Sequence, residues 1–149
     1  ANWQSLMSNL PHTPMYWLDI PEHFNDLVVG TYGRGIWILD DISPLQQLTE
    51  EVTSSDAHLF AQKAAYRFRP VSQVMQFFPE ASFGQDPPPG TALNYWLTEP
   101  SDSVELYITS ASGDTLRTLK HKGKKGINRV WWDLKGVPTS QILLRTYPL

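Results

Sequence analysis

The chain contains no cysteine among its 149 residues, which excludes disulfide bonds and thiolate metal sites. No apolar run in the sequence is long enough to cross a bilayer, so no membrane span is expected. The net charge is only -3, so composition favours neither nucleic acid nor a membrane surface as an obligatory partner. The sequence does contain 41% hydrophobic residues and six tryptophans, which indicates a folded chain.

The most informative stretch is residues 27–41, where two short apolar runs flank a glycine-rich turn. The runs are rich in β-branched and aromatic residues and are too short for helices. Gly33 and Gly35 flank Arg34 and can supply the positive φ that a tight turn needs. The sequence therefore predicts a β-hairpin that is largely buried on both faces.

The remaining pattern is that of a β-rich chain with one short helix. Residues 43–51 are predicted to be helical, with Ser43 as the cap and Pro44 at the first helical position. After Gly90 the apolar residues alternate with period two, which is typical of a sandwich. A bulged turn is expected at Gly113 and a loop at 120–126. Strands are predicted at residues 3–6, 15–20, 27–29, 36–39, 92–98, 104–108, 115–119, 128–134 and 141–146, and residues 57–60 and 66–69 are expected to be extended.

Residues 30–41 read Gly-Thr-Tyr-Gly-Arg-Gly-Ile-Trp-Ile-Leu-Asp-Asp and resemble the closing segment of a bacterial β-propeller family. That family is related to sortilin-type propellers and is often labelled glycosyl hydrolase because of its neuraminidase-type (BNR) Asp-box repeats. Residues 127–134, Ile-Asn-Arg-Val-Trp-Trp-Asp-Leu, resemble the β-sandwich that follows the propeller in the same family. A similar small sandwich occurs in flagellar hook-capping proteins.

The resemblance implies an all-β chain in three parts. It implies a last propeller blade with a short helix at 1–52, a linker at 53–90 and a small immunoglobulin-like β-sandwich at 91–149. The family's sandwich continues with a further strand, so this one is expected to lack its closing strand. The edge left open would include Ile142, Leu143 and Leu144. The resemblance also implies a piece of a longer extracellular or periplasmic protein.

The leading hypothesis for function is a non-catalytic scaffold or recognition segment of a larger secreted or envelope β-propeller protein. The alternative is a fragment of a glycoside hydrolase whose catalytic residues lie outside this chain. Glycoside hydrolysis needs two facing carboxyl groups, and no such set can be assembled from this sequence. The segment alone is therefore expected to be inactive and to need no cofactor. Its expected partner is the rest of the parent chain or another copy, with carbohydrate or peptide as the ligand class.

Three residues are the candidates for ligand contact. Arg34 at the predicted hairpin tip could bind an anion, a carboxylate or a sugar acid. Its structural alternative is an ion pair or hydrogen bonds to nearby carbonyl groups. Tyr32 and Trp37, together with Tyr16 and Trp17, could form an aromatic platform for sugars, and the alternative is packing between blades.

The other polar residues favour structural roles. Asp40 and Asp41 are adjacent, so in a strand they point to opposite faces and are predicted to cap or pair rather than to act as a catalytic or calcium-binding pair. Trp131 and Trp132 must likewise face opposite ways, with one of them in the core. The histidines show no metal-ligand spacing; they are His12, His23, His58 and His121.

A basic cluster lies in the second half of the chain. A solvated hairpin loop is its simplest explanation, because charged side chains keep the end of a sheet soluble. An acidic glycan, a nucleic acid or an acidic face of another domain is the alternative ligand. The cluster consists of Arg117, Lys120, Lys122, Lys124, Lys125, Arg129 and Lys135.

Overall fold

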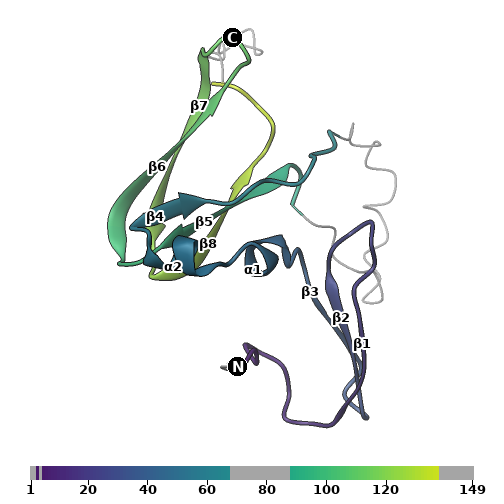
Figure 1. Ribbon diagram of the computed structural model, residues 1–149. Helices are drawn as coiled ribbons and strands as arrows, with labels where there is room; N and C mark the ends of the chain where they lie inside the picture. Colours follow the sequence, from purple (N-terminus) through teal and green to yellow (C-terminus); the bar gives the residue numbers. More distant parts are fainter. Residues whose placement is uncertain (1–2, 4, 68–87, 138–149) are drawn as a thin grey trace, which may run out of the picture. The chain divides into compact units, whose positions relative to one another are not determined.

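The structure is a computed structural model that describes residues 3, 5–67 and 88–137. The chain divides into two compact units, Ala1–Glu50 and Glu51–Leu149. Strands form most of the regular structure, and every strand pair among the described residues is antiparallel (Figure 1). The β-rich class predicted from the sequence is therefore confirmed.

The first unit contains one three-stranded sheet in the order β1-β2-β3. Its strands are β1 (Met15–Asp19), β2 (Leu27–Thr31) and β3 (Ile36–Leu39). The hairpin between β2 and β3 forms where the glycine-rich turn predicts it. The described residues within 3–6 form no strand, so the strand predicted there is wrong.

The expected burial of this hairpin on both faces is wrong. Val29 is the one residue of the three strands that is buried, with 4% of its surface exposed. Ile36 is 74% exposed and Ile38 is 60% exposed. A strand that is apolar on both faces needs a covering layer on each side, and this sheet is a single layer. The apolar sequence of these strands predicts burial, but the described residues of this unit do not cover the sheet.

The helical segment is interrupted and ends later than predicted. Helix α1 covers Ser43–Gln46 and helix α2 covers Glu50–Ser54, and they replace the single predicted helix. Ile42 is the N-cap of α1, so Ser43 is the first helical residue rather than the cap. Pro44 then follows within the first turn, where a missing N–H costs nothing because no intrahelical acceptor is available.

The second unit contains a three-stranded sheet in the order β4-β5-β8 and the hairpin β6-β7. The strands are β4 (Ala57–Leu59), β5 (Thr91–Leu97), β6 (Ser101–Thr109), β7 (Thr115–Gly123) and β8 (Gly126–Trp132). Strand β4 confirms the extended structure predicted at residues 57–60, and its pairing with β5 makes this part of the expected linker a strand of the second unit. Strand β7 extends to Gly123, so most of the predicted loop at 120–126 is strand.

The core of the second unit contains Phe60, Tyr95 and Leu97, which are all buried. Strand β6 alternates between more covered and exposed residues, as its period-two pattern predicts. The predicted turn of the β6-β7 hairpin is confirmed, because Gly113 has a φ of 92° and the register shifts at the adjoining strand ends. Two polar side chains, Asn94 and Asn128, are also buried.

Several predictions lie outside the described residues. The strand at 141–146 and the open edge with Ile142, Leu143 and Leu144 belong to this group. The residues 70–87 of the expected linker, including its three phenylalanines, belong to it as well. The structure describes no helix that is both long enough and apolar enough to cross a bilayer.

Candidate functional site

The tip of the hairpin between β2 and β3 is the first part of the candidate site. Gly33 and Gly35 have φ angles of 71° and 75°, a region that favours glycine. The backbone amide of Thr31 donates to the Gly35 carbonyl oxygen at 3.2 Å, and the Thr31 hydroxyl donates to the same oxygen at 2.6 Å. These contacts close the turn, with Arg34 exposed at its tip.

Arg34 and Trp37 meet through the backbone of the turn. Trp37 Nε1 donates to the Arg34 carbonyl oxygen at 2.9 Å, so the polar atom of the indole is used inside the hairpin. Trp37 lies opposite Val29 in the register and is half-buried. The described part of the chain provides no ion pair for the Arg34 guanidinium, which remains available for an anion. Trp37 has a structural role at this position.

Tyr32 pairs with Tyr16 rather than with Trp37. Their ring centroids lie 5.6 Å apart, with 39° between the ring planes. Two contacts hold the backbone of Tyr32: its amide donates to the Pro14 carbonyl oxygen at 3.0 Å, and the Thr13 hydroxyl donates to the Tyr32 carbonyl oxygen at 3.0 Å. Both rings are largely exposed. Two fixed, exposed phenol rings can stack on a sugar ring or on an apolar side chain.

The four aromatic residues expected in one platform do not share one surface. Trp17 lies opposite Gly30, whereas Trp37 lies opposite Val29. Gly30 and Val29 are consecutive in β2, so their partners occupy opposite faces of the sheet. The space above Gly30 is taken by Trp17, whose Cβ lies 3.4 Å from the position that a Cβ at Gly30 would occupy. The tyrosine pair is therefore the part of the predicted platform that the structure brings together.

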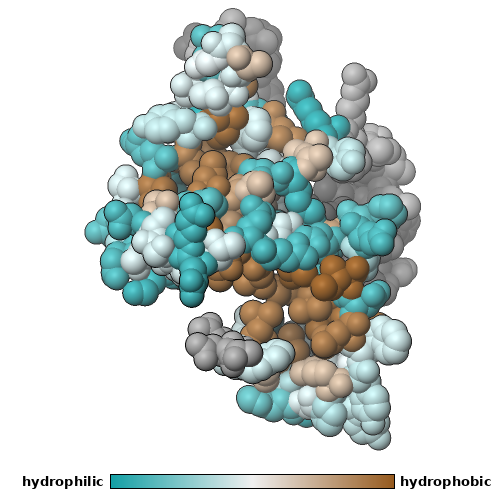
Figure 2. Space-filling model, in the orientation of Figure 1, coloured by the Kyte–Doolittle hydropathy of each residue, from teal (hydrophilic) through white to brown (hydrophobic). Residues whose placement is uncertain are grey.

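Both faces of the β1-β2-β3 sheet are apolar. Figure 2 shows hydrophobic atoms gathered over the strands of this unit. One face presents Trp17, Val28, Ile36 and Ile38, with the charged Asp19 at the end of β1. The other face presents Leu18, Leu27, Val29, Trp37 and Leu39. Such a sheet has the composition of an inner layer rather than of a surface layer.

The adjacent carboxylates, Asp40 and Asp41, have separate environments. Asp41 Oδ1 accepts hydrogen bonds from the Ser43 hydroxyl at 2.6 Å and from the Ser43 amide at 3.3 Å. The Asp41 amide donates to Asp26 Oδ1 at 2.8 Å. Asp41 precedes the N-cap Ile42 and contacts the first residue of α1, so it has a structural role beside the helix without being its N-cap.

Among the described residues, no group of three His, Cys, Asp or Glu side chains could hold a metal ion. His58 packs edge-on against Phe60, with ring centroids 5.3 Å apart. His121 Nδ1 lies 2.7 Å from the Tyr95 hydroxyl. These two histidines serve packing and hydrogen bonding inside the second unit.

The basic cluster is largely paired within the second unit. Four of its lysines form ion pairs, so much of the predicted positive charge is locally neutralised. This arrangement favours the solvated-loop explanation over an anionic glycan or nucleic acid. The pairs are Lys120–Glu105 at 2.8 Å, Lys122–Asp102 at 2.6 Å, Lys125–Glu99 at 3.2 Å and Lys135–Asp133 at 4.0 Å.

The two arginines of the cluster also have contacts inside the second unit. Arg117 Nη1 donates to the Gly136 carbonyl oxygen at 3.2 Å, and Arg129 Nε donates to the side-chain oxygen of Asn94 at 2.9 Å. Because Asn94 is buried, its carboxamide holds the Nε atom of Arg129 in place. Both arginines are therefore part of the structure of this unit.

The Glu105 carboxylate has two partners on this surface, Lys120 and Tyr107. The pKa of the Glu105 carboxyl lies below its usual range because Lys120 donates a hydrogen bond to it and Tyr107 donates a second. The same carboxylate raises the pKa of Lys120 and of the Tyr107 hydroxyl. All three side chains lie at the surface, so this cluster stabilises ionised Glu105 without forming a closed site.

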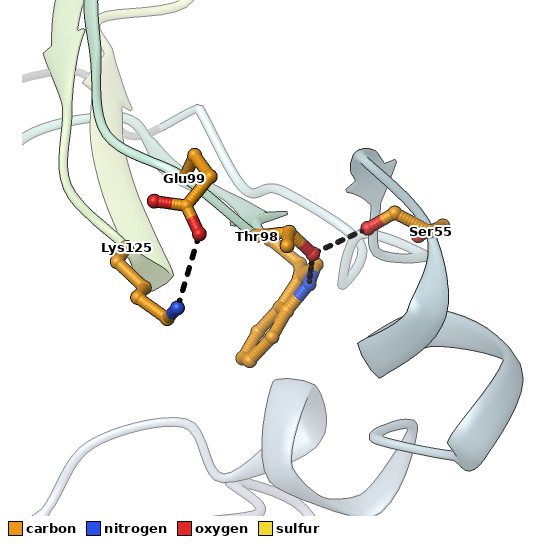
Figure 3. Close-up of polar contacts among 5 residues, drawn as sticks. Ser55, Thr98, Glu99 and Lys125 are labelled. Atoms are coloured by element: carbon orange, nitrogen blue, oxygen red, sulfur yellow. Dashed lines mark hydrogen bonds and ion pairs between the residues drawn. The ribbon is translucent and has the colours of Figure 1, made fainter.

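A second polar contact region connects the end of α2 with the end of β5 (Figure 3). The Thr98 hydroxyl donates to the Ser55 carbonyl oxygen at 2.7 Å, and Trp96 Nε1 donates to the Thr98 hydroxyl at 3.3 Å. The neighbouring Glu99 pairs with Lys125, as Figure 3 shows. The bond between Thr98 and Ser55 joins segments 43 residues apart in the sequence. These contacts stabilise the second unit.

Trp131 and Trp132 occupy consecutive positions in β8. Trp131 is exposed and Trp132 is half-buried, so the prediction that one of them lies in the core is wrong. Trp132 Nε1 donates to the Lys135 carbonyl oxygen at 2.9 Å. The exposed ring of Trp131 remains a surface feature, whereas Trp132 closes the turn that follows β8.

The sequence did not predict the residues that position Tyr32, nor the buried polar residues that form hydrogen bonds inside the second unit. Thr13 precedes a proline in a predicted loop, and no local signal indicates its hydrogen bond to Tyr32. The same holds for Asn128, whose carboxamide is tied to the backbone of residues 124 and 126. Tyr95 was detectable only as one residue of a strand with period-two alternation.

The comparisons with known proteins add no further constraint. No protein-family model, no curated protein and no solved structure matches the chain.

Proposed function

We propose that this chain is a non-catalytic scaffold or recognition segment of a larger secreted or envelope β-propeller protein. The observation that carries the proposal is the β1-β2-β3 sheet, which is apolar on both faces and largely exposed within this chain. An exposed apolar area of this kind marks a surface that packs against another structure. The resemblance of residues 30–41 to the closing segment of a propeller supplies the architecture of the parent protein.

The arrangement of the strands supports a blade segment. Propeller blades are small antiparallel sheets that neighbouring blades cover on both sides. The strands β1, β2 and β3 are short, antiparallel and consecutive, with a tight turn between the last two. The rows Trp17–Gly30–Ile36 and Leu18–Val29–Trp37 give each face its own apolar stripe. Both stripes are suited to contact with a second sheet.

Two aspartates near the end of the first sheet have structural contacts. Asp41 accepts two hydrogen bonds from Ser43, and Asp26 accepts one from the Asp41 amide. These carboxylates hold the corner between β3 and α1. A glycoside hydrolase would need two carboxyl groups on either side of a sugar, and in the competing hypothesis they would lie elsewhere in the parent protein.

The exposed tyrosine pair is the part of this segment best suited to recognition. Tyr16 and Tyr32 form an adjacent aromatic surface, and Arg34 lies two residues beyond Tyr32 at the turn. Aromatic rings with a nearby guanidinium can bind a carbohydrate or a peptide that carries a carboxylate. We therefore assign ligand contact to Tyr32 and Arg34, and a supporting role to Trp37.

The scaffold proposal is tested with a triple variant that combines Trp17→Ser, Ile36→Ser and Ile38→Ser. In the longer protein that contains this chain, the triple variant should lower the melting temperature strongly because it removes a buried sheet contact. In the chain alone it should improve solubility and leave the melting temperature unchanged. A matched control is Tyr107→Ser with Leu116→Ser, which alters exposed apolar residues of the second unit. Equal melting temperatures of the triple variant and the unaltered longer protein would refute the proposal.

A separate assay distinguishes the scaffold from the hydrolase fragment. The longer protein is tested for release of sugar from a panel of glycosides, with variants of acids inside and outside this chain. The scaffold hypothesis predicts no turnover. Turnover that disappears only when acids outside this chain are replaced would instead support the hydrolase alternative.

A further inference from the structure

One hydrogen bond joins the hairpin β6-β7 to the sheet β4-β5-β8 through a titratable side chain. The Tyr95 hydroxyl of β5 lies 2.7 Å from Nδ1 of His121 on β7. The two rings meet edge-on, with centroids 6.1 Å apart and 87° between their planes. Tyr95 is only 3% exposed, so its hydroxyl depends on partners inside the protein.

The hydroxyl of Tyr95 lies in an apolar corner. A side chain at Gly123 would collide with Leu97 and come within 3.1 Å of Val104 and 3.3 Å of the Tyr95 hydroxyl, so glycine keeps this space open. Among the described residues, His121 is the one hydrogen-bond partner of that hydroxyl. Burial raises the pKa of the Tyr95 phenol, which keeps its proton in place at neutral and acidic pH.

The face of the hairpin that carries His121 is almost free of charge. His121 lies opposite Val104, and the next pair on that face is Leu106 with Leu119. Arg117, one pair further along, is the charged group of that face, and its guanidinium donates to the Gly136 carbonyl oxygen.

The other charged groups near His121 point away from it. Glu105 and Lys120 pair with each other on the opposite face of the hairpin, as do Asp102 and Lys122. From the sheet, β5 contributes Tyr95 and β8 contributes the uncharged Asn128, which lies opposite Tyr95 in the register. No carboxylate of the described residues therefore stands ready to compensate a positive charge on His121.

We propose that the Tyr95–His121 hydrogen bond is a pH-sensitive latch that holds the β6-β7 hairpin on the β4-β5-β8 sheet while His121 is neutral. In the neutral tautomer with its proton on Nε2, Nδ1 accepts the proton of the Tyr95 hydroxyl. Protonation adds a hydrogen to Nδ1, so the imidazole loses its acceptor and the buried hydroxyl hydrogen loses its partner. The latch is then weakened, and the hairpin keeps its packing and the hydrogen bonds that join Leu116 to the Val137 amide and Arg117 to the Gly136 carbonyl oxygen. This inference does not depend on the proposed scaffold function.

The test is thermal and chemical unfolding of the full chain between about pH 8 and about pH 5.5, a range in which histidine titrates and most carboxylates do not. Loss of one buried hydrogen bond should raise the unfolding equilibrium constant about five- to thirtyfold at the acidic end. Tyr95→Phe should lower stability at pH 8 and remove the pH step. His121→Gln, which retains an acceptor that does not titrate in this range, should remove the step as well. His58→Gln is the matched control and should keep it.

A second measurement covers the case in which a variant does not fold. The nitrogen NMR shifts of His121 in the unaltered chain should report an unprotonated Nδ1 at pH 8 and its protonation on acidification. Amide exchange should accelerate in β6 and β7 more than in β5 over the same range. A proton on Nδ1 at pH 8, a flat stability profile, or a pH step that survives in Tyr95→Phe would overturn the latch.

Discussion

The sheets β1-β2-β3 and β4-β5-β8 are both three-stranded and antiparallel, but they differ in what covers them. In the first sheet Val29 is the one buried strand residue, and large apolar side chains are exposed on both faces. In the second sheet β5 alone contributes the buried residues Asn94, Tyr95 and Leu97. The hairpin β6-β7 supplies the second layer that the first unit lacks among its described residues.

The difference can be traced to the pattern of each strand. Strand β3 reads Ile-Trp-Ile-Leu, a continuous apolar run that demands burial on both faces. Strand β6 alternates, so one face packs inward and the other carries Asp102, Glu105 and Tyr107 into solvent. A two-layer unit satisfies the second pattern completely. The first pattern needs three layers, and the described residues of the unit with β3 form one sheet with large apolar side chains exposed.

The largest expected effect is a difference in the free energy of unfolding between matched truncations in the two sheets. Leu97→Ala removes a side chain that is only 8% exposed, and should lower the free energy of unfolding by about 2–5 kcal/mol. Ile38→Ala is the matched truncation in the first sheet and should leave the stability of this chain nearly unchanged. Denaturant unfolding of both variants measures the contrast. A similar loss for the two variants would show that the first sheet has a core of its own.

The next effect tests whether polar groups also complete the second unit. The buried carboxamide of Asn128 accepts from the Lys124 amide at 2.8 Å and donates to the carbonyl oxygens of Lys124 and Gly126 at 2.6 and 2.9 Å. Asn128→Ala leaves these groups without that partner and should cost about 1–3 kcal/mol. Ser103→Ala, at an exposed position of β6, is the control. Unfolding of the Asn128 variant at the same denaturant midpoint as the control would contradict this role.

A smaller and local effect is expected in the first unit. Asp41→Ala removes the acceptor for the Ser43 hydroxyl and amide and should destabilise the first turn of α1 by about 1 kcal/mol. Asp41→Asn keeps an oxygen at this site and tolerates its positive φ of 53°, so it should lose much less. Amide exchange at residues 45–47 measures the change. Equal exchange in the two variants would argue against the carboxylate contact.

The smallest effect concerns the exposed charges of the second unit. The pKa of the Glu105 carboxyl is lower in the folded chain than in the unfolded chain. Ionised Glu105 therefore stabilises the fold above its unfolded pKa, and this stabilisation is lost as the pH falls through its folded pKa. Lys120→Ala should return this pKa toward its ordinary value, and added salt should act in the same direction. Carboxyl NMR titration follows the change, with no measurable shift of the melting temperature. Glu105 that titrates identically in the variant would exclude the ion pair in solution.

Much of the local structure follows from local signals. The glycines at 33 and 35 predict the turn of the first hairpin, and Gly113 predicts the turn of the second. The apolar runs on either side fix β2 and β3 to within two residues. A structural role for one of Asp40 and Asp41 is also predicted locally, and the structure gives the contact with Ser43 to Asp41. These predictions succeed because each depends on residues that are close together in the chain.

The sequence by itself determined the strands, the turns and the demand of β3 for cover on both faces, because alternation and glycine act through the backbone of the same few residues. The tertiary structure alone decided which distant groups meet. It pairs β4 with β5 across more than thirty residues, and it brings the hydroxyl of Tyr95 to His121. It also splits the aromatic residues of the first sheet between two faces, because a bulge shifts the register between Met15 and Trp17. Long-range pairing depends on the whole packed unit, and no local pattern encodes it.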